Sequence, residues 1–269
     1  MNIHPTAVID PGAELGSDVT VKPFAVIEGG VRIGDGCVIG PHVTILRHTT
    51  LGRQCRVHAG AVLGDMPQDL GFDNSPSYVR IGDGCVIREG VTIHRGTKPE
   101  TETVVGNQCF LMALTHLGHN VVLGNQVIIA NSVLLAGYVN IGERAFISGH
   151  VTIHQFVRVG RLAMLGGMAG ISQDVPPFCT AKPHTVNRIL GLNVVGLRRA
   201  GMSPDERLAV KRAFAVLYRA GLNHGEAVAR IRAEFGNSPP ALELAEFVAQ
   251  SKRGICSLSF TTPDDEEEA

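Results

Sequence analysis

Aliphatic residues recur at every sixth position along the first two thirds of the chain. Counting in steps of six from Ile3 reaches 29 positions by Ile171, and Ile, Leu or Val occupies 26 of them. The three exceptions are Asp69, Ser75 and Pro99. A fixed period of this kind is the sequence signature of a repeat architecture. The pattern predicts a solenoid, a three-sided parallel β-helix, in which each hexad supplies one short flat strand and one turn.

Glycine often follows the aliphatic residue of a hexad, at Gly34, Gly40, Gly52, Gly82, Gly106, Gly124, Gly142 and Gly160. Because glycine adopts positive φ at no steric cost, these positions indicate tight corners with positive φ. Three faces of six residues make a coil of 18, and neighbouring coils should lie about 4.8 Å apart, the usual spacing of paired strands. Residues 18 positions apart are therefore expected to stack.

Two segments interrupt the surface pattern, residues 66–78 (MPQDLGFDNSPSY) and residues 94–104 (HRGTKPETETV). The six-residue register is the same before and after each segment. The sequence therefore predicts two loops that replace strand material without breaking the solenoid. Long loops on a rigid scaffold commonly carry function.

The period changes after Pro177, where the repeat gives way to a helical pattern. Ser203 and Pro204 form a helix start, with a capping serine, a proline in the first turn and acidic residues directly after it. Further helices are expected over 225–235 and 240–251. We predict a β-helix domain over 1–190, a helical domain over 191–258 and a disordered acidic tail over 259–269.

The charge pattern excludes several classes of function. The formal net charge is −1, and no block of lysine or arginine indicates binding to nucleic acid or to an anionic membrane surface. No apolar run reaches the ~18 residues of a membrane span. The N-terminus lacks the basic and apolar pattern of a signal peptide, so we expect a cytoplasmic protein.

Residues 103–142 contain no Asp, Glu, Lys or Arg. A β-helix that stands alone needs solvated charges on its outer faces, so burial against another subunit is the preferred interpretation. Ladders of asparagine and glutamine side chains are the alternative.

Four cysteines lie two positions before a repeat aliphatic residue, at Cys37, Cys55, Cys85 and Cys109. Val31, Val43 and Ala61 occupy the same place in other hexads. The cysteines are therefore interpreted as small buried core side chains, not as metal ligands or a disulfide framework.

The candidate chemistry lies in the uncharged stretch and directly after it. His116 and His119 occur in ALTHLGHN, and His154 and Gln155 in VTIHQF. Steps of 18 place His119, Gly137 and Gln155 in one vertical column, with the backbone N–H of Gly137 one coil above the imidazole. A general base beside a backbone donor is what acyl transfer to an alcohol requires, because one group takes the hydroxyl proton and the other holds the oxyanion.

A zinc site is the main competing interpretation. His58 and His94 are 36 positions apart and are expected to stack two coils apart. A catalytic zinc needs three convergent ligands and an open position, and the pattern offers no clear third ligand. The sequence therefore predicts no metal and no other cofactor.

Seven motifs occur in order across the chain: MPQDL, VTIHRGT, THLGH, VTIHQF, SQDVPPF, GLNVVGLRR and SKRGIC. Together they resemble the acyl-carrier-protein-dependent UDP-N-acetylglucosamine O-acyltransferases, which begin lipid A synthesis. The resemblance implies a left-handed β-helix and a homotrimer with active sites in the grooves between subunits. It also implies transfer of a 3-hydroxyacyl chain from acyl carrier protein to the 3-hydroxyl of the UDP-sugar.

The resemblance assigns roles to individual residues. His119 falls where the family has its general base, and Gly137 falls at the oxyanion donor. The expected substrate contacts are Gln68, Asp69, His116, His154 and Gln155, together with Asn193 and Arg199 of the helical domain, which would face the nucleotide and its phosphates. Gly167 matches the position that limits acyl length, and glycine there predicts a preference for a longer chain.

Four residues depart from the family pattern and leave the acceptor open. Gly71 replaces a usual lysine, Tyr138 a histidine, Val195 a glutamate, and Asn120 the acid after the catalytic histidine. A paralogue that acylates a 3-amino sugar nucleotide is one alternative. A zinc-dependent hydratase-like enzyme and a catalytically silent trimer that binds a sugar nucleotide or acyl carrier protein are two others.

Overall fold

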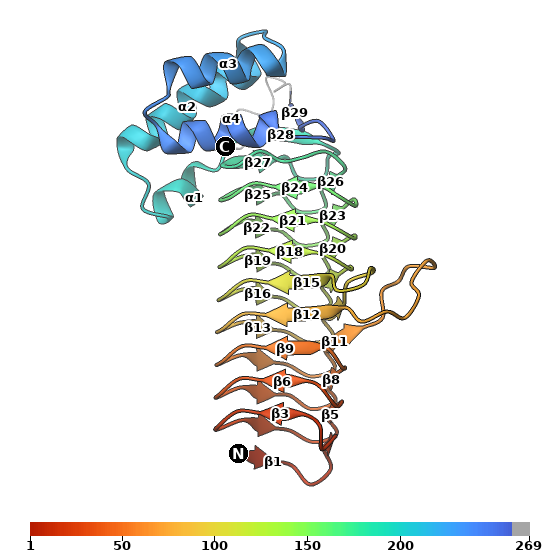
Figure 1. Ribbon diagram of the computed structural model, residues 1–269. Helices are drawn as coiled ribbons and strands as arrows, with labels where there is room; N and C mark the ends of the chain where they lie inside the picture. Colours follow the sequence, from red (N-terminus) through yellow and green to blue (C-terminus); the bar gives the residue numbers. More distant parts are fainter. Residues whose placement is uncertain (260–269) are drawn as a thin grey trace.

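The computed structural model describes residues 1–259, and Figure 1 shows a column of stacked coils capped at one end by helices. Nearly all strands pair in parallel with the next coil, as Asn2 does with Thr20 and Ile3 with Val21. Backbone hydrogen bonds of about 2.9 Å join successive coils, for example from the N–H of Asn2 to the carbonyl of Val19. The parallel β-helix predicted from the six-residue period is therefore present.

Within residues 1–259 the strands form three sheets, one for each side of the column. Sheet A contains β1 (Asn2–Ile3), β4 (Thr20–Val21), β7 (Val38–Ile39), β10 (Arg56–Val57), β13 (Val86–Ile87), β16 (Phe110–Leu111), β19 (Ile128–Ile129), β22 (Phe146–Ile147), β25 (Met164–Leu165), β27 (Cys179–Ala181), β28 (Arg188–Leu192) and β29 (Ser257–Leu258). Sheet B contains β2 (Val8–Ile9), β5 (Val26–Ile27), β8 (Thr44–Ile45), β11 (Val62–Asp65), β14 (Thr92–His94), β17 (His116–Leu117), β20 (Leu134–Leu135), β23 (Thr152–Ile153) and β26 (Gly170–Ile171). Sheet C contains β3 (Glu14–Leu15), β6 (Arg32–Ile33), β9 (Thr49–Leu51), β12 (Tyr78–Ile81), β15 (Glu102–Val105), β18 (Val122–Leu123), β21 (Asn140–Ile141) and β24 (Arg158–Val159).

The repeat aliphatic residues point inward from all three sheets and fill one continuous core. The four cysteines of the repeat share this core, and each is free and buried. Their thiols donate to main-chain carbonyls of neighbouring coils, as Cys37 Sγ does to the carbonyl of Gly52 at 3.0 Å. These cysteines are core side chains, as predicted.

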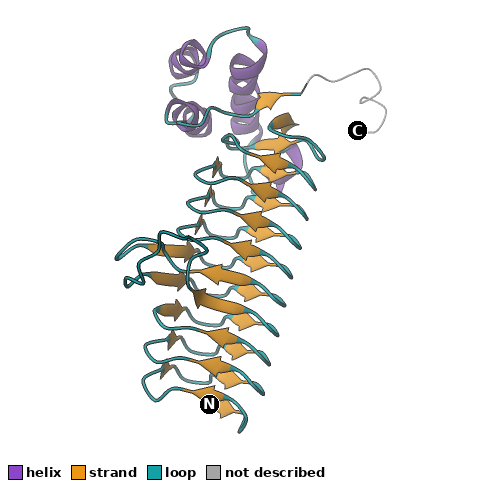
Figure 2. Ribbon diagram, turned by 90° about the vertical axis from the view of Figure 1, so that its right-hand side faces the viewer, coloured by secondary structure: helices purple, strands orange, loops and turns teal. Residues whose placement is uncertain are grey.

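The two loops lengthen their coils, and the prediction that they replace strand material is wrong. Arg56 pairs with Val86, 30 positions later, and Val86 pairs with Phe110, 24 positions later. The coils thus gain twelve and six residues, and both are multiples of the repeat, so the register survives. The loops leave the same side of the column (Figure 2), joined where the N–H of Glu100 donates to the carbonyl of Pro76.

The glycines that follow the aliphatic residues have a different function from the one expected. The left-handed residues lie two positions later, as at His42 (φ 57°), and most of them are not glycine. Gly34 is not among the residues with positive φ. A Cβ on Gly34 would lie 2.7 Å from the carbonyl carbon of Gly52 in the next coil. These glycines are therefore required by the close approach of stacked coils and not by the turn.

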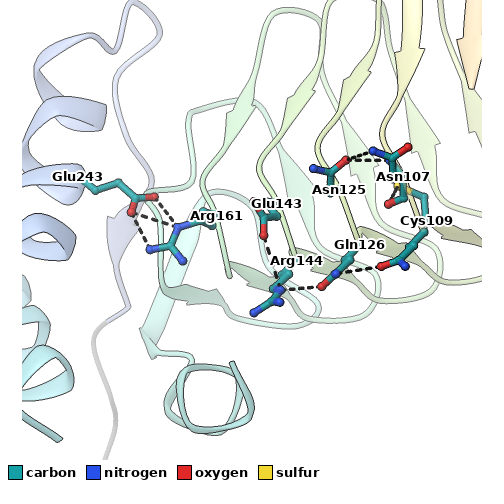
Figure 3. A network of polar contacts seen from close by, with 9 residues as sticks. Asn107, Cys109, Asn125, Gln126, Glu143, Arg144, Arg161 and Glu243 are labelled. Atoms are coloured by element: carbon teal, nitrogen blue, oxygen red, sulfur yellow. Dashed lines mark hydrogen bonds and ion pairs between the residues drawn. The ribbon is translucent and has the colours of Figure 1, made fainter. Parts of the chain in front are cut away.

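Amide ladders account for part of the uncharged stretch. At one corner Gln126 Nε2 donates to Gln108 Oε1 at 3.0 Å, and the N–H of Asn107 donates to Asn125 Oδ1 at 2.8 Å (Figure 3). The flat faces differ, because Leu134 is 49% exposed and Val122 is 36% exposed. Ladders of amide side chains therefore hydrogen-bond the polar groups at the corner, whereas apolar side chains remain exposed on the flat faces.

The helical part contains α1 (Val194–Arg199), α2 (Pro204–Arg219), α3 (His224–Glu234) and α4 (Pro239–Ala249). Ser203 caps α2 in a capping box with Glu206, as its sequence predicts. The three longer helices pack around a small core of their own. The sequence did not reveal α1, because six residues including a glycine give no apolar stripe.

The helical part is fastened to the last coils by charged contacts. Asp174 Oδ2 accepts from Arg158 Nε at 3.2 Å and from Ser251 Oγ at 2.8 Å. Arg161 forms a two-pronged ion pair with Glu243 of α4 (Figure 3). The predicted division at residue 190 falls inside β28 and stays a prediction. From residue 260 on, the predicted acidic tail lies outside the described residues.

Candidate active site

A groove of about 710 Å³ runs along the outer surface of β17, β20, β23 and β26 in sheet B. The exposed surface of the groove is mostly apolar, and several polar side chains also line it. Predicted site residues that line it are Gln68, His116, His119, Gly137, His154 and Gln155. Four elements and one loop that are distant in sequence therefore converge on one hollow.

His119 lies at the corner that follows β17, and its ring covers Gly137 of the next coil. A Cβ on Gly137 would lie only 2.5 Å from Nε2 of His119, so only glycine leaves room for the imidazole. The coils are joined here by hydrogen bonds from the N–H of Tyr138 to the carbonyl of His119 and from the N–H of Phe156 to the carbonyl of Gly137. The column predicted by steps of 18 is present.

Asn120 fixes the tautomer of His119. Its Oδ1 lies 3.1 Å from Nδ1 of His119 and also accepts from the backbone N–H of Thr97 at 3.0 Å. Because a backbone N–H can only donate, the amide must present its oxygen to both neighbours. Nδ1 of His119 therefore carries the proton, and Nε2 is left with a free lone pair beside Gly137.

Thr97 also holds Asp69, the acid of the QDL motif. The Thr97 hydroxyl donates to Asp69 Oδ2 at 2.7 Å, and the N–H of Gly71 donates to Asp69 Oδ1 at 2.9 Å. These two hydrogen bonds, with a further contribution from His119, lower the pKa of Asp69 below its usual value. Thr97 thus connects the histidine to the carboxylate, a function that the sequence analysis missed.

His116 is neutral at physiological pH. Burial, helped by the nearby His94, lowers the pKa of His116 to about 4. Its Nδ1 lies 2.7 Å from the hydroxyl of Thr92, and the ring of His94 meets it edge-on at 4.9 Å. Burial also lowers the pKa of His94, which lines the groove. Both neighbours of His116 were missed, because the six-residue insertion shifts them out of the 18-residue arithmetic.

The remaining predicted residues lie outside the groove lining. Gly167 occupies another corner, where a Cβ would meet the carbonyl oxygen of Gly149 at 3.6 Å. Asn193 caps α1: its Oδ1 accepts from the N–H of Gly196, and its Nδ2 donates to the carbonyl of Leu162. Arg199 is exposed at the end of α1. The functions assigned to these residues stay predictions.

The prediction that His58 and His94 stack two coils apart, which a zinc site would need, is wrong. The N–H of His58 donates to the carbonyl of Ile87, and its Nδ1 lies 3.4 Å from Oε1 of Glu89, in the turn that follows β13 of sheet A. His94 ends β14 on sheet B. Among the residues described, no three His, Cys, Asp or Glu side chains converge as metal ligands. Nor does any helix in residues 1–259 have the length and apolar character to cross a membrane.

The six-residue repeat and the stacked coils place the chain in the class of hexapeptide-repeat proteins, and comparison with known proteins agrees. The family model "Bacterial transferase hexapeptide (six repeats)" matches residues 12–47, 30–65 and 102–137, and the model "Udp N-acetylglucosamine O-acyltransferase; Domain 2" matches residues 174–256. The chain belongs to the UDP-N-acetylglucosamine O-acyltransferase family.

Two relatives named acyl-[acyl-carrier-protein]–UDP-N-acetylglucosamine O-acyltransferase illustrate the similarity. The protein of Chlorobaculum parvum is 50% identical and the match covers 94% of this chain and 96% of the relative. That of Chlorobaculum tepidum is 48% identical over 97% and 98%.

Solved structures agree with this assignment. A UDP-N-acetylglucosamine acyltransferase from Bacteroides fragilis superposes with a TM-score of 0.90 at 38% identity, over 94% of this chain and 98% of the other. The enzyme of that name from Campylobacter jejuni gives 0.89 at 38% identity, over 95% and 99%. The predicted left-handed parallel β-helix with a C-terminal helical part is thereby confirmed.

Proposed function

We propose that this chain transfers a 3-hydroxyacyl group from acyl carrier protein to the 3-hydroxyl of UDP-N-acetylglucosamine, the first step of lipid A biosynthesis. The observation that carries the proposal is the imidazole of His119, whose free Nε2 lies against the backbone of Gly137 in an apolar groove. Relatives up to 50% identical that carry this activity in their names support it.

Each step of the proposed reaction has a residue that can perform it. Nε2 of His119 takes the proton of the sugar hydroxyl as its oxygen attacks the thioester carbonyl carbon. The N–H of Gly137, which makes no hydrogen bond among the described residues, donates to the oxyanion that forms. When the carbon–sulfur bond breaks, the imidazolium returns its proton to the departing thiolate.

The polar side chains at the groove can bind the sugar. The neutral ring of His116 offers a nitrogen to a hydroxyl without burying a charge. Gln68, His154 and Gln155 are exposed toward the groove, and Asp69 stands ready to accept from sugar hydroxyls. Arg199 is exposed and free to face phosphate, while the amide of Asn193 would have to share its capping contacts to reach the nucleotide.

A homotrimer would complete the site. The groove lies open along sheet B, and the exposed Leu134 and Val122 belong to the uncharged stretch that such an assembly would cover. A cytoplasmic location fits the proposed donor and acceptor. Light scattering of the purified chain would measure the subunit number, and a monomer would remove this part of the proposal.

Acyl length should depend on Gly167. A Cβ there would lie at ordinary contact distance from the carbonyl oxygen of Gly149, 3.6 Å, so the backbone can accept a side chain. We expect Gly167→Met to shift the preference toward shorter acyl chains by at least two carbons, in competition assays with acyl carrier proteins of several lengths. An unchanged preference would count against this role.

The activity itself is tested with 3-hydroxyacyl carrier proteins and a panel of UDP-sugars, with products identified by mass spectrometry. Acylated UDP-N-acetylglucosamine bearing an ester is the expected product, and His119→Ala should lower turnover by ~10³-fold or more. An amide formed on a 3-amino sugar nucleotide would identify the other acceptor class. Absence of product with every acceptor would overturn the enzyme proposal.

A further inference from the structure

Tyr138 and Phe156 form a stacked aromatic pair next to His119. They are 18 positions apart, both at left-handed corner positions with φ of 60° and 65°. Their ring centroids are 4.9 Å apart and their planes differ by 13°. Tyr138 in turn meets the His119 imidazole edge-on, at 5.3 Å and 84°. Three rings on three successive coils thus make one continuous contact.

The contact from Tyr138 differs from the other two that hold the imidazole. Asn120 fixes one edge of the His119 ring through Nδ1, and the backbone of Gly137 in the next coil lies against the face of the ring. Burial raises the pKa of Tyr138, with a contribution from Asp69, so the phenol stays neutral. Tyr138 therefore packs an uncharged ring against His119, and Phe156, itself 53% exposed, packs against Tyr138 from the next coil.

We propose that Tyr138, supported by Phe156, is a positioning residue that keeps Nε2 of His119 aimed at the substrate hydroxyl. This inference rests on the proposed role of His119 as the base. Orientation of a base affects the chemical step, so its loss should lower kcat and leave KM unchanged. The rings could instead form a platform on which a planar part of the substrate stacks, and their loss would then raise KM.

Steady-state kinetics of the full chain separate these outcomes. We expect Tyr138→Leu to lower kcat by about two- to tenfold, the range that the loss of one aromatic pair implies, with KM unchanged. Phe156→Leu should lower kcat by a smaller factor. In the double variant with Tyr138→Leu, it should lower kcat no further, because Phe156 acts through the ring of Tyr138. Tyr138→Phe keeps the ring and should restore most of the turnover.

Phe24→Leu is the matched control. Phe24 is 54% exposed, has φ of 60° and stacks on the ring of His42 at 5.1 Å, far from the groove. It therefore reports the general cost of removing an exposed stacked ring from this solenoid. We expect its kcat to equal that of the wild type.

A second measurement reads the imidazole directly. In protein labelled with ¹⁵N-histidine, the His119 signals should show the Nδ1-protonated tautomer in the wild type and in Tyr138→Phe. In Tyr138→Leu they should show averaging of the two tautomers, because the ring without its aromatic neighbour turns away from Asn120. An unchanged kcat and unchanged signals in Tyr138→Leu, or a rise in KM alone, would overturn the positioning role. A wild type without turnover, or turnover that survives His119→Ala, would instead overturn the proposed function. The ¹⁵N signals would still test whether Tyr138 and Phe156 hold the His119 ring in place.

Discussion

At the scale of single residues, the site is built from side chains that hydrogen bonds hold in fixed orientations. Asn120 cannot stabilise an imidazolium by charge, but the hydrogen bond it accepts from Thr97 forces its oxygen toward His119. The same threonine holds the carboxylate of Asp69 through its hydroxyl. One residue of the second loop therefore sets both the tautomer of His119 and the position of the Asp69 carboxylate.

The neutral His116 makes stability depend on pH. The unfolded chain protonates this histidine near its ordinary pKa of about 6.5, whereas the folded chain does so only near about 4. As the pH falls, the unfolded state binds the proton first. The free energy of unfolding should therefore be full above about pH 6.5 and decrease between about 6.5 and 4.

Thermal unfolding of the wild type and of His116→Gln at pH 7 and pH 5 checks this. Glutamine can keep a hydrogen bond to Thr92 but does not titrate. We expect the wild type to lose a few degrees more than the variant, since about 1 kcal/mol shifts Tm by roughly 2–4 °C in a chain of this size. Parallel losses in the two proteins would show that burial of His116 costs nothing.

The sequence predicts which residues stack on one another wherever the repeat runs uninterrupted. His119, Gly137 and Gln155 follow both loops, so steps of 18 place them correctly. Thr92, His94 and Thr97 precede or lie in the second loop, and no periodicity gives the number of residues that a loop adds. Contacts made by an inserted segment therefore needed the structure.

At the scale of the elements, the strands are so short that the corners determine the fold. Each described coil needs a residue in the left-handed region, and asparagine, histidine and even phenylalanine occupy it here. Such a conformation costs roughly 1–2 kcal/mol outside glycine. Neighbouring coils hold each corner on both sides. Glycine also occupies some of these corners, as at Gly30 and Gly60, but the glycines that directly follow the aliphatic residues are required where backbones of stacked coils approach.

This distinction predicts unequal effects of adding one methyl group to two corner glycines. A Cβ on Gly124 would lie 2.7 Å from the backbone nitrogen of Glu143, whereas a Cβ on Gly149 would lie 3.5 Å from the nearest carbonyl oxygen, that of Asn131. Gly124→Ala should lower the free energy of unfolding by about 1–3 kcal/mol, the usual cost of overpacking. Gly149→Ala should change it by less than about 0.5 kcal/mol. Equal losses in denaturant unfolding would show that coil spacing does not decide where glycine is required.

At the scale of the whole molecule, the helical part must keep a fixed place over the last coils if its residues are to contribute to the site. Asp174 is the centre of that attachment, because it is 2% exposed and accepts from the N–H and Nε of Arg158 and from Ser251. The guanidinium of Arg158 also lies 4.2 Å from the ring centroid of Phe247 in α4. This buried carboxylate is thus the most buried of the charged contacts that join the solenoid to the helices.

The attachment can be tested by removing this one charge. Asp174→Asn would place an amide hydrogen-bond donor against Arg158 or Ser251 and leave a half-buried guanidinium without its counter-ion, at a cost of about 3–5 kcal/mol. Glu243→Gln breaks the more exposed pair with Arg161 and should cost about 0–1 kcal/mol. We expect limited proteolysis to cut Asp174→Asn between the coils and α1 while the coils stay intact, and to leave Glu243→Gln as resistant as the wild type. Equal resistance of both variants would mean that apolar packing alone holds the helices in place.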